Sequence, residues 1–474
     1  MRPRPIVAGL AAAAAVALVA AGCGSSSTAG SASSLGGAAS VAPSNVVAFV
    51  ALDTDSSSAQ WSTVDGLLDK FPGYDTVLAN LRKTFEQRTK LNWDDDVKPA
   101  LGAELDLIAL PGKEPQVVGL TQGGNQAKLD VLLHSLDKNI KSEQIGGWTV
   151  FSKTQAALDT VKSSTTKLSD NNTYRTAIAK LADDALVRAY ANGTEAQQLL
   201  AALGKQSPSV STPPFAWASA DLVAAGDSVR VVAYSHDSSM RGIAPRLRPT
   251  PPVPYASSLV DEIPAGALFV ADFPVTPGEL SDTGALPDAL KKFLDASPTF
   301  LSELDDVLGG ETAIYVRNGV PIPEVTIVTQ PNDTKVAVAS LADVLKTLRA
   351  AGGTRTGGFN LADIPIVHDV VGGQLIISTS QQGIADFRSA GAKLSADSSF
   401  TAAVKASAMP TETTGFLYAN LVTAVPLVQM LAPLLGITLP AAVASTDLSA
   451  LRSLTAYGTR KGDESTFTVF LGVH

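Results

Sequence analysis

Residues 95–104 read Asp-Asp-Val-Lys-Pro-Ala-Leu-Gly-Ala-Glu, and residues 305–311 read Asp-Asp-Val-Leu-Gly-Gly-Glu. Both segments join a pair of aspartates and a valine to the sequence Leu-Gly-x-Glu. One short match of this kind is expected by chance in a chain of 474 residues. Further matches between the two halves of the chain would instead indicate that one structural unit occurs twice.

Such further matches occur in the same order in both halves, at a nearly steady separation of roughly 200 residues. They pair Phe49–Ala51 with Phe269–Ala271, Gly146-Gly147 with Gly372-Gly373, Lys167–Ser169 with Lys393–Ser395, Tyr190–Asn192 with Tyr418–Asn420, and Gly226-Asp227 with Gly462-Asp463. An ordered set is much harder to obtain by chance than any single match. It predicts an internal duplication in which Phe49 superposes on Phe269 and Tyr190 on Tyr418.

The pattern of apolar residues predicts the same succession of helices and strands in both halves. In the first half we expect a strand at Val46–Leu52, two helices within Trp61–Leu91 separated by Pro72-Gly73, a hairpin of Leu105–Leu110 and Gln116–Thr121, a helix at Gln126–Leu136 and a strand at Trp148–Phe151. This β-α-β-β-α-β order is that of the ferredoxin-like split motif. The prediction is an α+β fold of two duplicated domains, each a mostly antiparallel sheet with helices on one face.

Composition sets the expected domain boundaries. Residues 1–22 have the basic start and apolar run of an export signal. Residues 23–42 begin with Cys23 and are then nearly all Gly, Ser, Ala and Thr, which predicts a flexible tether. Residues 238–260 are rich in proline and predict an extended linker. Residues 43–237 and 261–474 remain as the two repeat domains.

Cys23 is the only cysteine of the chain, and it follows Leu18-Val19-Ala20-Ala21-Gly22. A lone cysteine after small residues resembles the lipobox of bacterial lipoproteins. The resemblance implies cleavage before Cys23, diacylglycerol on its sulfur, and a lipid-anchored protein on the outer face of the cell membrane. The alternative is a membrane-spanning helix, but the uncharged run from Ile6 to Ala21 is shorter than the about 20 residues that a span needs.

Two further segments resemble an uncharacterised family of bacterial envelope proteins, the domain-of-unknown-function family numbered 3352. One is the opening Pro43–Asp53, with the pattern P-x-x-V-x-A-F-V-A-L-D, and the other is Asp95–Glu104. The resemblance covers most of the chain after Cys23. It implies an exported, membrane-attached protein, and it assigns no catalytic residue.

Charge and residue counts weigh against several other classes of function. The formal net charge of −9 repels phosphate backbones, so nucleic acid is not an expected partner. The four histidines are far apart in the sequence and no cysteine accompanies them, so no metal site is expected. His134 is interpreted as structural, and Asp94–Asp96 as a solvated helix start. No cofactor motif is present.

A set of serine motifs imitates the penicillin-recognising enzymes. Ser164–Lys167 fits S-x-x-K, Ser169–Asn171 fits S-D-N, and Arg355–Gly357 approximates K-T-G. In those enzymes the first two motifs come from separate elements on opposite sides of a cleft. Here only Leu168 lies between them, so they cannot face each other across a substrate, and we assign no catalytic residue.

The segment Thr413–Thr446 contains no charged residue. Within it, Leu421–Ala444 is mostly apolar, and Pro426, Pro433 and Pro440 interrupt it, which disfavours a regular membrane span. Two interpretations stay open: a buried helix pair, or the wall of an apolar pocket or a membrane-facing surface. The candidate core or pocket residues are Leu427, Leu431, Leu434 and Leu435.

Together these observations favour a non-enzymatic, membrane-anchored envelope lipoprotein that binds an apolar ligand or another envelope protein. Its expected contacts are the membrane, through lipid on Cys23, and a lipid or a protein partner. An envelope hydrolase and a purely structural envelope protein are the alternatives.

Lipidation is tested by replacing the sulfur that would carry the diacylglycerol. We expect the wild-type N-terminal peptide to begin at Cys23 and to carry the added mass of a lipid. The Cys23→Ala variant should stay an unlipidated precursor. Mass spectrometry of the detergent-extracted protein measures both, and a wild-type chain with no mass added at Cys23 would contradict the anchor.

Overall fold

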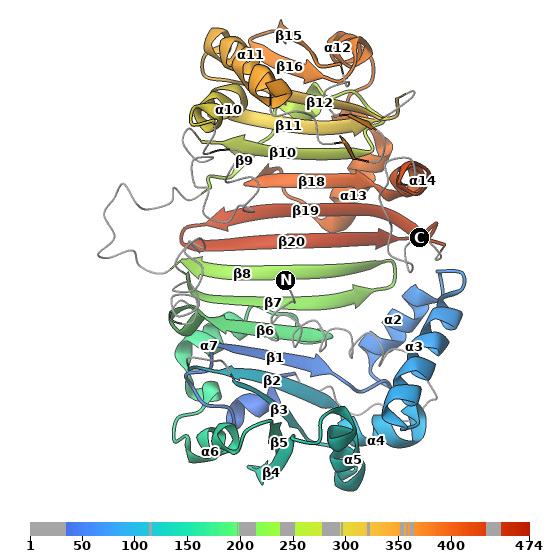
Figure 1. Cartoon of the computed structure of the whole chain (residues 1–474), viewed down its shortest axis with the longest axis vertical. Helices are drawn as coiled ribbons and strands as arrows, with labels where there is room; N and C mark the ends of the chain where they lie inside the picture. The colour runs from blue at the N-terminus through green and yellow to red at the C-terminus, as the bar shows by residue number, and fades with distance from the viewer. Residues whose placement is uncertain are drawn as a thin grey trace. The chain divides into compact units, whose positions relative to one another are not determined.

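The structure, a computed structural model, confirms the expected α+β class, with long antiparallel sheets and helices packed on them (Figure 1). The residues that it describes are 35–112, 116–196, 198, 215–237, 252–276, 294, 297–319, 323–350, 355–356, 359–360, 365–432 and 447–474. Cys23 lies outside these residues.

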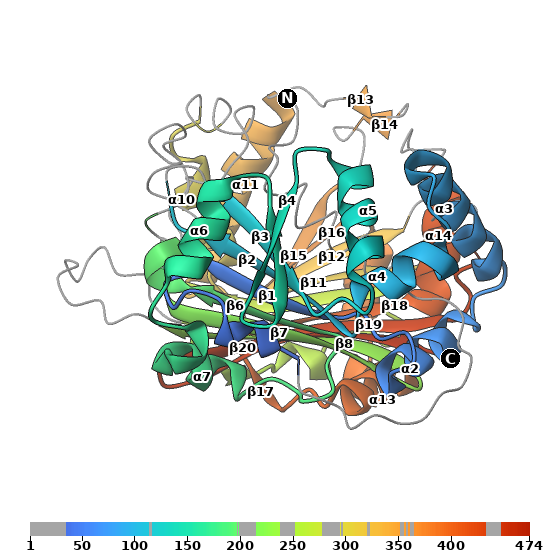
Figure 2. The ribbon, with the colours of Figure 1, turned by 90° about the horizontal axis from the view of Figure 1, so that it is seen from below.

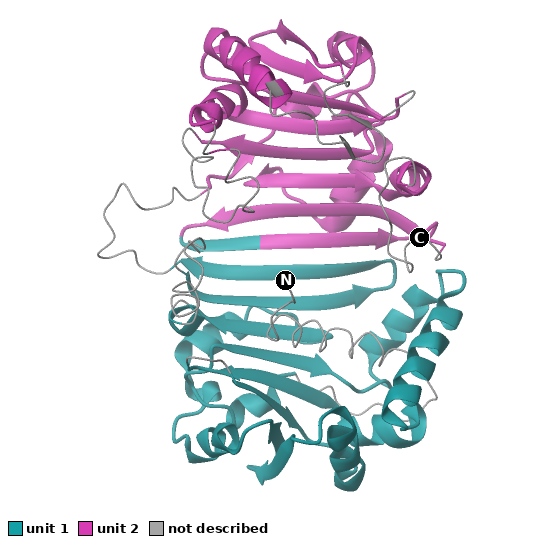
Figure 3. Cartoon of the chain, in the orientation of Figure 1, with its two compact units in different colours: residues 1–206, 212–248, 463–466 teal, residues 207–211, 249–462, 467–474 magenta. Residues whose placement is uncertain are grey.

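The described chain divides into two compact units (Figure 3). Unit 1 holds the described residues up to 237 and residues 463–466, and unit 2 holds residues 252–462 and 467–474. The elements that begin in unit 1 are η1 Gly37–Ser40, β1 Ala48–Asp53, α2 Ala59–Leu68, α3 Tyr74–Thr89, η2 Trp93–Val97, α4 Lys98–Leu101, β2 Glu104–Leu110, β3 Gln116–Thr121, α5 Gln126–Leu136, β4 Lys141–Ile145, β5 Trp148–Ser152, α6 Gln155–Ser163, η3 Leu168–Asp170, α7 Asn172–Ile178, β6 Val187–Asn192, β7 Phe215–Ala225 and β8 Ser228–Asp237.

Unit 2 shares much of this succession, but between its first two main strands the described chain has α10 alone, where unit 1 has α2, α3, η2 and α4. Its elements are β9 Tyr255–Ala256, η5 Leu259–Asp261, β10 Phe269–Val275, α10 Phe300–Leu308, β11 Gly310–Arg317, β12 Glu324–Thr329, α11 Thr334–Ala350, β13 Arg355–Thr356, β14 Phe359–Asn360, β15 Val367–Val371, β16 Gln374–Ser378, α12 Gln381–Arg388, η8 Leu394–Ala396, α13 Ser398–Ser407, β17 Glu412–Thr413, β18 Gly415–Asn420, α14 Leu421–Leu431, β19 Leu451–Lys461 and β20 Glu464–Val473.

The main strands of the two units follow the same order. In unit 1 the order is β4-β5-β3-β2-β1-β6-β7-β8, and in unit 2 it is β15-β16-β12-β11-β10-β18-β19-β20. The repeated glycine pairs also have equivalent roles, because Gly146-Gly147 and Gly372-Gly373 form the turns β4–β5 and β15–β16 with positive φ. The arrangement is compatible with an internal duplication.

Two details differ from the expectation. The expected β-α-β-β-α-β order is present, but β1 lies directly beside β2 as its antiparallel partner, so the strands do not pair as in a ferredoxin-like motif. The order of elements along a chain does not fix which strands pair. Helices also cover both faces rather than one. The side chain of Thr149 in β5 contacts α5, whereas the next residue, Val150, packs with α6, and Figure 2 shows these helices on either side of β4.

The expected superposition of Phe49 on Phe269 is wrong by one residue. Phe49 lies opposite Tyr190, and in unit 2 it is Val270 that lies opposite Tyr418. Phe49 and Val270 are both fully buried, whereas Phe269 is half-buried on the other face. Since side chains alternate between faces, a slip of one residue would turn every side chain of the strand over.

Folded structure begins earlier than composition indicated. Residues 36–42, expected in the tether, form η1 and bury Ala38 and Ala42 completely. Residues 255–260, expected in the linker, form β9 and η5, where Leu259 is fully buried. Small residues give a flexible chain in isolation, but they also let a backbone approach a sheet closely, and composition does not distinguish the two cases.

The glutamate of the repeated Leu-Gly-x-Glu sequence holds the segment that leads into each unit, residues 36–37 in unit 1 and 258–259 in unit 2, by hydrogen bonds. The carboxylate of Glu104 accepts hydrogen bonds from the backbone N–H groups of Gly36, at 2.5 Å, and Gly37, at 3.0 Å. In the same way Glu311 accepts from the N–H groups of Ser258, at 2.9 Å, and Leu259, at 3.2 Å. The match found in the sequence therefore records a structural contact at the start of each unit.

A second buried carboxylate lies beside each of these glutamates. In unit 1 it belongs to Asp106 on β2, opposite Ala51, and in unit 2 it belongs to Asp272 on β10, opposite Ala313. The equivalent cross-strand pair thus consists of one aspartate and one alanine in both units. The aspartate lies on the second strand of the pair in unit 1 and on the first strand in unit 2. Burial raises the pKa of Asp106 well above its usual value, and nearby Glu104 raises it further.

Asp272→Asn tests this arrangement through the pH dependence of stability. Burial raises the pKa of Asp272 from 3.8 to about 6, so the folded state binds more protons than the unfolded state between these values. The preferential protonation of Asp272 therefore stabilises the folded state fully below pH 3.8, and this stabilisation is lost as the pH rises through about 6.

As the pH is raised from 4 to 7, the wild type loses this stabilisation and Asp272→Asn does not. We therefore expect the free energy of unfolding of Asp272→Asn to increase relative to that of the wild type by up to about 3 kcal/mol. Asparagine keeps the size and one of the two acceptor oxygens. The hydroxyls of Tyr255 and Ser257 donate to different oxygens of Asp272, and the amide of asparagine can donate to one of these hydroxyls instead. Urea unfolding followed by circular dichroism across this range measures the difference. A difference that does not change with pH would contradict the raised pKa.

Candidate apolar binding site

α14 begins immediately after β18 and carries no charged residue. It contains Pro426, yet no residue within its bounds is fully buried. Val422, Val428 and Met430 are 50%, 52% and 61% exposed. An apolar helix that buries none of its side chains completely is unusual, because a helix is normally stabilised by packing its apolar face.

Beneath α14 lies a partly open pocket with a volume of about 370 Å³, entirely within unit 2. Its wall is made of aliphatic residues, one phenylalanine and one proline. The lining residues are Leu268, Phe269, Val316, Pro323, Ala419, Ala424, Leu427, Val428, Leu431 and Ala432. Such a lining offers no side-chain hydrogen bond to a ligand.

Strand register and helix spacing bring this wall together. Phe269 of β10 lies opposite Val316 of β11 on one side and Ala419 of β18 on the other, so all three side chains share one face of the sheet. Leu427 and Leu431 are four residues apart on α14 and therefore lie on the same side of the helix. The helix forms the roof of the pocket and the sheet its floor.

Two of the four leucines predicted from the sequence line this pocket. Leu427 and Leu431 are half-buried rather than mostly buried, because the pocket leaves part of their surface uncovered. Leu434 and Leu435 lie outside the described residues. Phe269 and Val316 could not be assigned to the site from the sequence, since only strand pairing places them beside α14.

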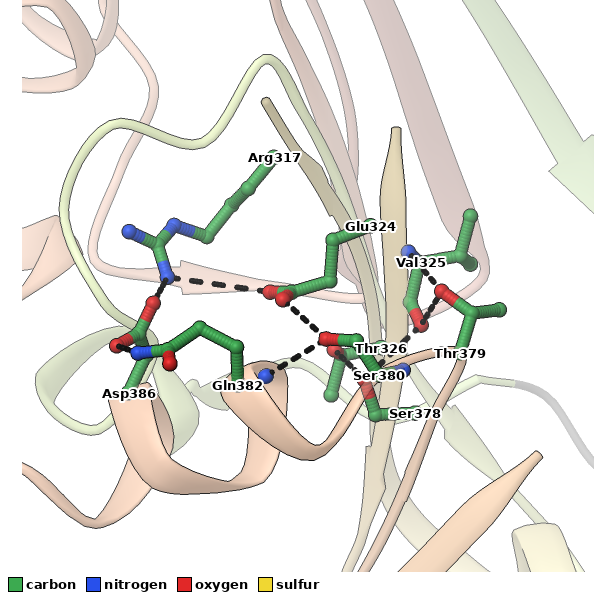
Figure 4. Close-up of polar contacts among 10 residues, drawn as sticks. Arg317, Glu324, Val325, Thr326, Ser378, Thr379, Ser380, Gln382 and Asp386 are labelled. Carbon is green, nitrogen blue, oxygen red and sulfur yellow. Dashed lines mark hydrogen bonds and ion pairs between the residues drawn. The ribbon is translucent and has the colours of Figure 1, made fainter. Parts of the chain in front are cut away.

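A polar cluster elsewhere in unit 2 places a serine beside a carboxylate and is therefore a second candidate site, for catalysis (Figure 4). The hydroxyl of Ser380 donates to buried Glu324 at 2.6 Å, and Arg317 pairs with both Glu324, at 3.9 Å, and Asp386. A serine beside a carboxylate is one part of an activated nucleophile. The oxygen of Ser380 also accepts a hydrogen bond from the N–H of Gly383 at 2.9 Å, as a helix N-cap does.

Unit 1 contains the equivalent contact without the charges. There Thr154 caps α6 by accepting from the N–H of Ala157, and its hydroxyl donates to Gln116 at 2.7 Å. The bond between a capping hydroxyl and the first residue of the neighbouring strand is thus present in both units. We interpret Ser380 as the cap that joins α12 to β12.

Side chains of the S-x-x-K motif in unit 1 also make structural hydrogen bonds to the backbone. The hydroxyl of Ser164 donates to the carbonyl of Thr166, and the ammonium group of Lys167 donates to the carbonyls of Val41 and Val161. Lys393, the equivalent lysine of unit 2, donates to the carbonyl of Phe387 in the same way. This lysine fastens a turn in both units.

In the described part of the chain, no group of three or more His, Cys, Asp or Glu side chains is placed to hold a metal ion. His134 is on α5, where its ring lies 2.7 Å from the carbonyl of Asp130, and Asp94 pairs with Lys98 at 3.1 Å. Among the described helices, none combines the length and hydropathy needed to cross a membrane.

Comparisons with known proteins add little. No family model matches the chain, and no curated protein matches it. Among solved structures, crystal form III of TP0453 is 7% identical over 42% of this chain and 80% of that chain, with a TM-score of 0.24. Crystal form I of TP0453 is 8% identical over 43% and 80%, with a TM-score of 0.23. Similarity this low supports no conclusion about fold or function.

Matched substitutions distinguish a cap from a catalytic serine. We expect Ser380→Ala and Thr154→Ala each to lower the free energy of unfolding by about 1 kcal/mol, because each removes one N-cap. Urea unfolding measures both variants. A fluorophosphonate probe, which reacts with activated serines, should leave Ser380 unlabelled. Labelling of the wild type that disappears in Ser380→Ala would show that the cluster is catalytic.

Proposed function

We propose that this chain is a non-enzymatic lipoprotein of the cell envelope that binds an apolar ligand in the pocket beneath α14. The observation that carries the proposal is the composition of the wall, where each residue is Leu, Val, Ala, Phe or Pro. The volume of about 370 Å³ lies near the lower end of the roughly 300–1,000 Å³ common for ligand sites.

The chemistry of the wall favours the hydrocarbon part of a ligand. Removing apolar surface from water contributes about 25 cal/mol per Å², and the wall adds no polar side chain that would orient a head group. A ligand held in this way is recognised by the shape and length of its apolar part, and its polar end stays outside the pocket.

The location is proposed from the sequence. A lipid on Cys23 would hold the protein at the outer face of the cell membrane, and the resemblance to the envelope family numbered 3352 agrees with an exported, membrane-attached protein. A membrane is also the source of apolar ligands closest to a protein attached to it. The location and the pocket thus support each other.

The outer side of α14 favours a second candidate function. Val422, Val428 and Met430 expose large apolar surfaces that another envelope protein could cover. Val428 belongs to both surfaces, since it also lines the pocket. Neighbouring residues Met430 and Leu431, however, point to different sides of the helix, which allows the two functions to be separated.

Leu431→Asp places a carboxylate in the pocket, where it would lose hydration without gaining a partner. We expect it to reduce the affinity for the fluorescent fatty acid cis-parinaric acid at least tenfold, and to reduce the lipid that co-purifies with the protein. Met430→Asp is the matched control, because Met430 is 61% exposed and is not part of the pocket wall. Its fatty-acid affinity should stay within about twofold of the wild type.

Fluorescence titration and mass spectrometry of co-purified lipids measure these outcomes, with melting temperature as the check on folding. Two folded variants that both bind like the wild type would show that the pocket is not the site. A wild-type protein that binds no fatty acid and carries no lipid would contradict the proposed function. Loss of a co-purified protein in Met430→Asp alone would favour the second candidate.

A further inference from the structure

The floor of the pocket belongs to a larger apolar surface on the sheet of unit 2. Cross-strand pairing aligns residues of five neighbouring strands in a first row: Val325, Val316, Phe269, Ala419 and Leu454. Two residues further along the strands lies a second row: Ile327, Ile314, Ala271, Leu417 and Ala456. All ten side chains are apolar and share one face of the sheet.

One hydrophobic core of unit 2 lies on the opposite face, where Val270, Tyr315 and Tyr418 are buried in a single cluster. A second core lies on the face of the two rows at its β12 end, where Ile327 packs against the cluster of α10 and α11. Apart from Ala419, which is buried, the residues of the two rows are half-buried. An antiparallel sheet with one dry face usually carries polar residues on its other face, so the half-buried apolar residues outside the α10 and α11 cluster are candidates for contact with a ligand.

The two rows continue from the pocket along the strands. Phe269, Val316 and Ala419 of the first row are pocket residues, and the second row lies about 7 Å further along the strands. In the row beyond it, Thr312 and Thr329 are buried and donate their hydroxyls to the carbonyls of Leu308 and Val307, and Phe273, opposite Thr312, is half-buried.

We propose that the pocket and the second row form one continuous track for a hydrocarbon chain longer than the pocket alone can hold. This inference rests on the proposed function and specifies its ligand as a long, unbranched acyl chain. Five strands span about 19 Å, and the track crosses them beside Ile314, Ala271 and Leu417. The affinity for an acyl chain then depends on its length, because only a chain long enough to reach the second row gains contacts there.

Unit 1 provides an internal comparison. The residues of its first row are mostly smaller, because Ala48 lies between Ala109 and Ala191 where unit 2 has Phe269 between Val316 and Ala419. In the second row, Val50 takes the place of Ala271. Substitution at Val50 is therefore a matched control for substitution at Ala271.

The test compares fatty acids of increasing length as competitors of cis-parinaric acid. For the wild type we expect octadecanoic acid to bind at least tenfold more tightly than decanoic acid. Ala271→Phe fills the middle of the second row with an apolar side chain that strands accommodate well. It should bring the two affinities to within about threefold by weakening the longer acid, and Val50→Phe should leave the ratio unchanged.

Each outcome bears on one claim. Equal affinities for both acids in the wild type, or an unchanged preference in folded Ala271→Phe, would overturn the dependence on chain length while leaving the pocket in place. If Ala271→Phe does not fold, a series from octanoic to eicosanoic acid on the wild type decides: a plateau at decanoic acid contradicts the track. Leu431→Asp should weaken both acids, and no binding of either acid by the wild type would refute the proposed function itself.

Discussion

The alternation of side chains along antiparallel strands is the constraint on which this structure depends. In both units one face of the sheet buries large side chains, such as Phe49 with Tyr190 and Val270 with Tyr418. The other face receives every second residue. In unit 2 many of those residues are also apolar, and outside the cluster of α10 and α11 most of them stay half-buried. The pocket beneath α14 lies on this part of the face.

The two units help to separate structure from function. Contacts present in both belong to the fold: the glutamates that hold the segments leading into each unit, the lysines Lys167 and Lys393, and the capping hydroxyls of Thr154 and Ser380. Features present in one unit are candidates for function. The Arg317–Glu324 pair is one of these, but it modifies a shared cap. The larger side chains beside α14 modify a surface that is open to a ligand.

Much of the fold could be predicted from the sequence. Pro72-Gly73 separates two helices as expected, and Gly73 has a positive φ of 83°. Helix α5 has the predicted bounds, because apolar spacing and the capping residue Asn125 agree there. Strand pairing was not predictable in this way. The shared Phe-Val-Ala sequence pointed to Phe269, but burial, which depends on tertiary contacts, makes Val270 the counterpart of Phe49.

The candidate site was predictable in part for the same reason. An uncharged segment drew attention to Leu427 and Leu431, whose roles are local to one helix. Phe269 and Val316 come from strands far away in the sequence, and Pro323 directly precedes β12. Nothing in their local pattern indicates a pocket. The tether was misjudged because Gly and Ala were counted by composition, whereas the decisive contact is made by Glu104, some seventy residues later.

That contact also sets a working distance for the protein. With Gly36 and Gly37 held on the sheet by Glu104, eleven residues lie between Cys23 and Leu35, where the described structure begins. The twelve steps from Cys23 to Leu35 span at most about 40 Å whatever their conformation, which is close to the full thickness of a bilayer. With the proposed lipid on Cys23, unit 1 would therefore remain in a thin layer above the membrane. Each encounter with a membrane lipid would then resemble an intramolecular event, with an effective concentration near the millimolar range.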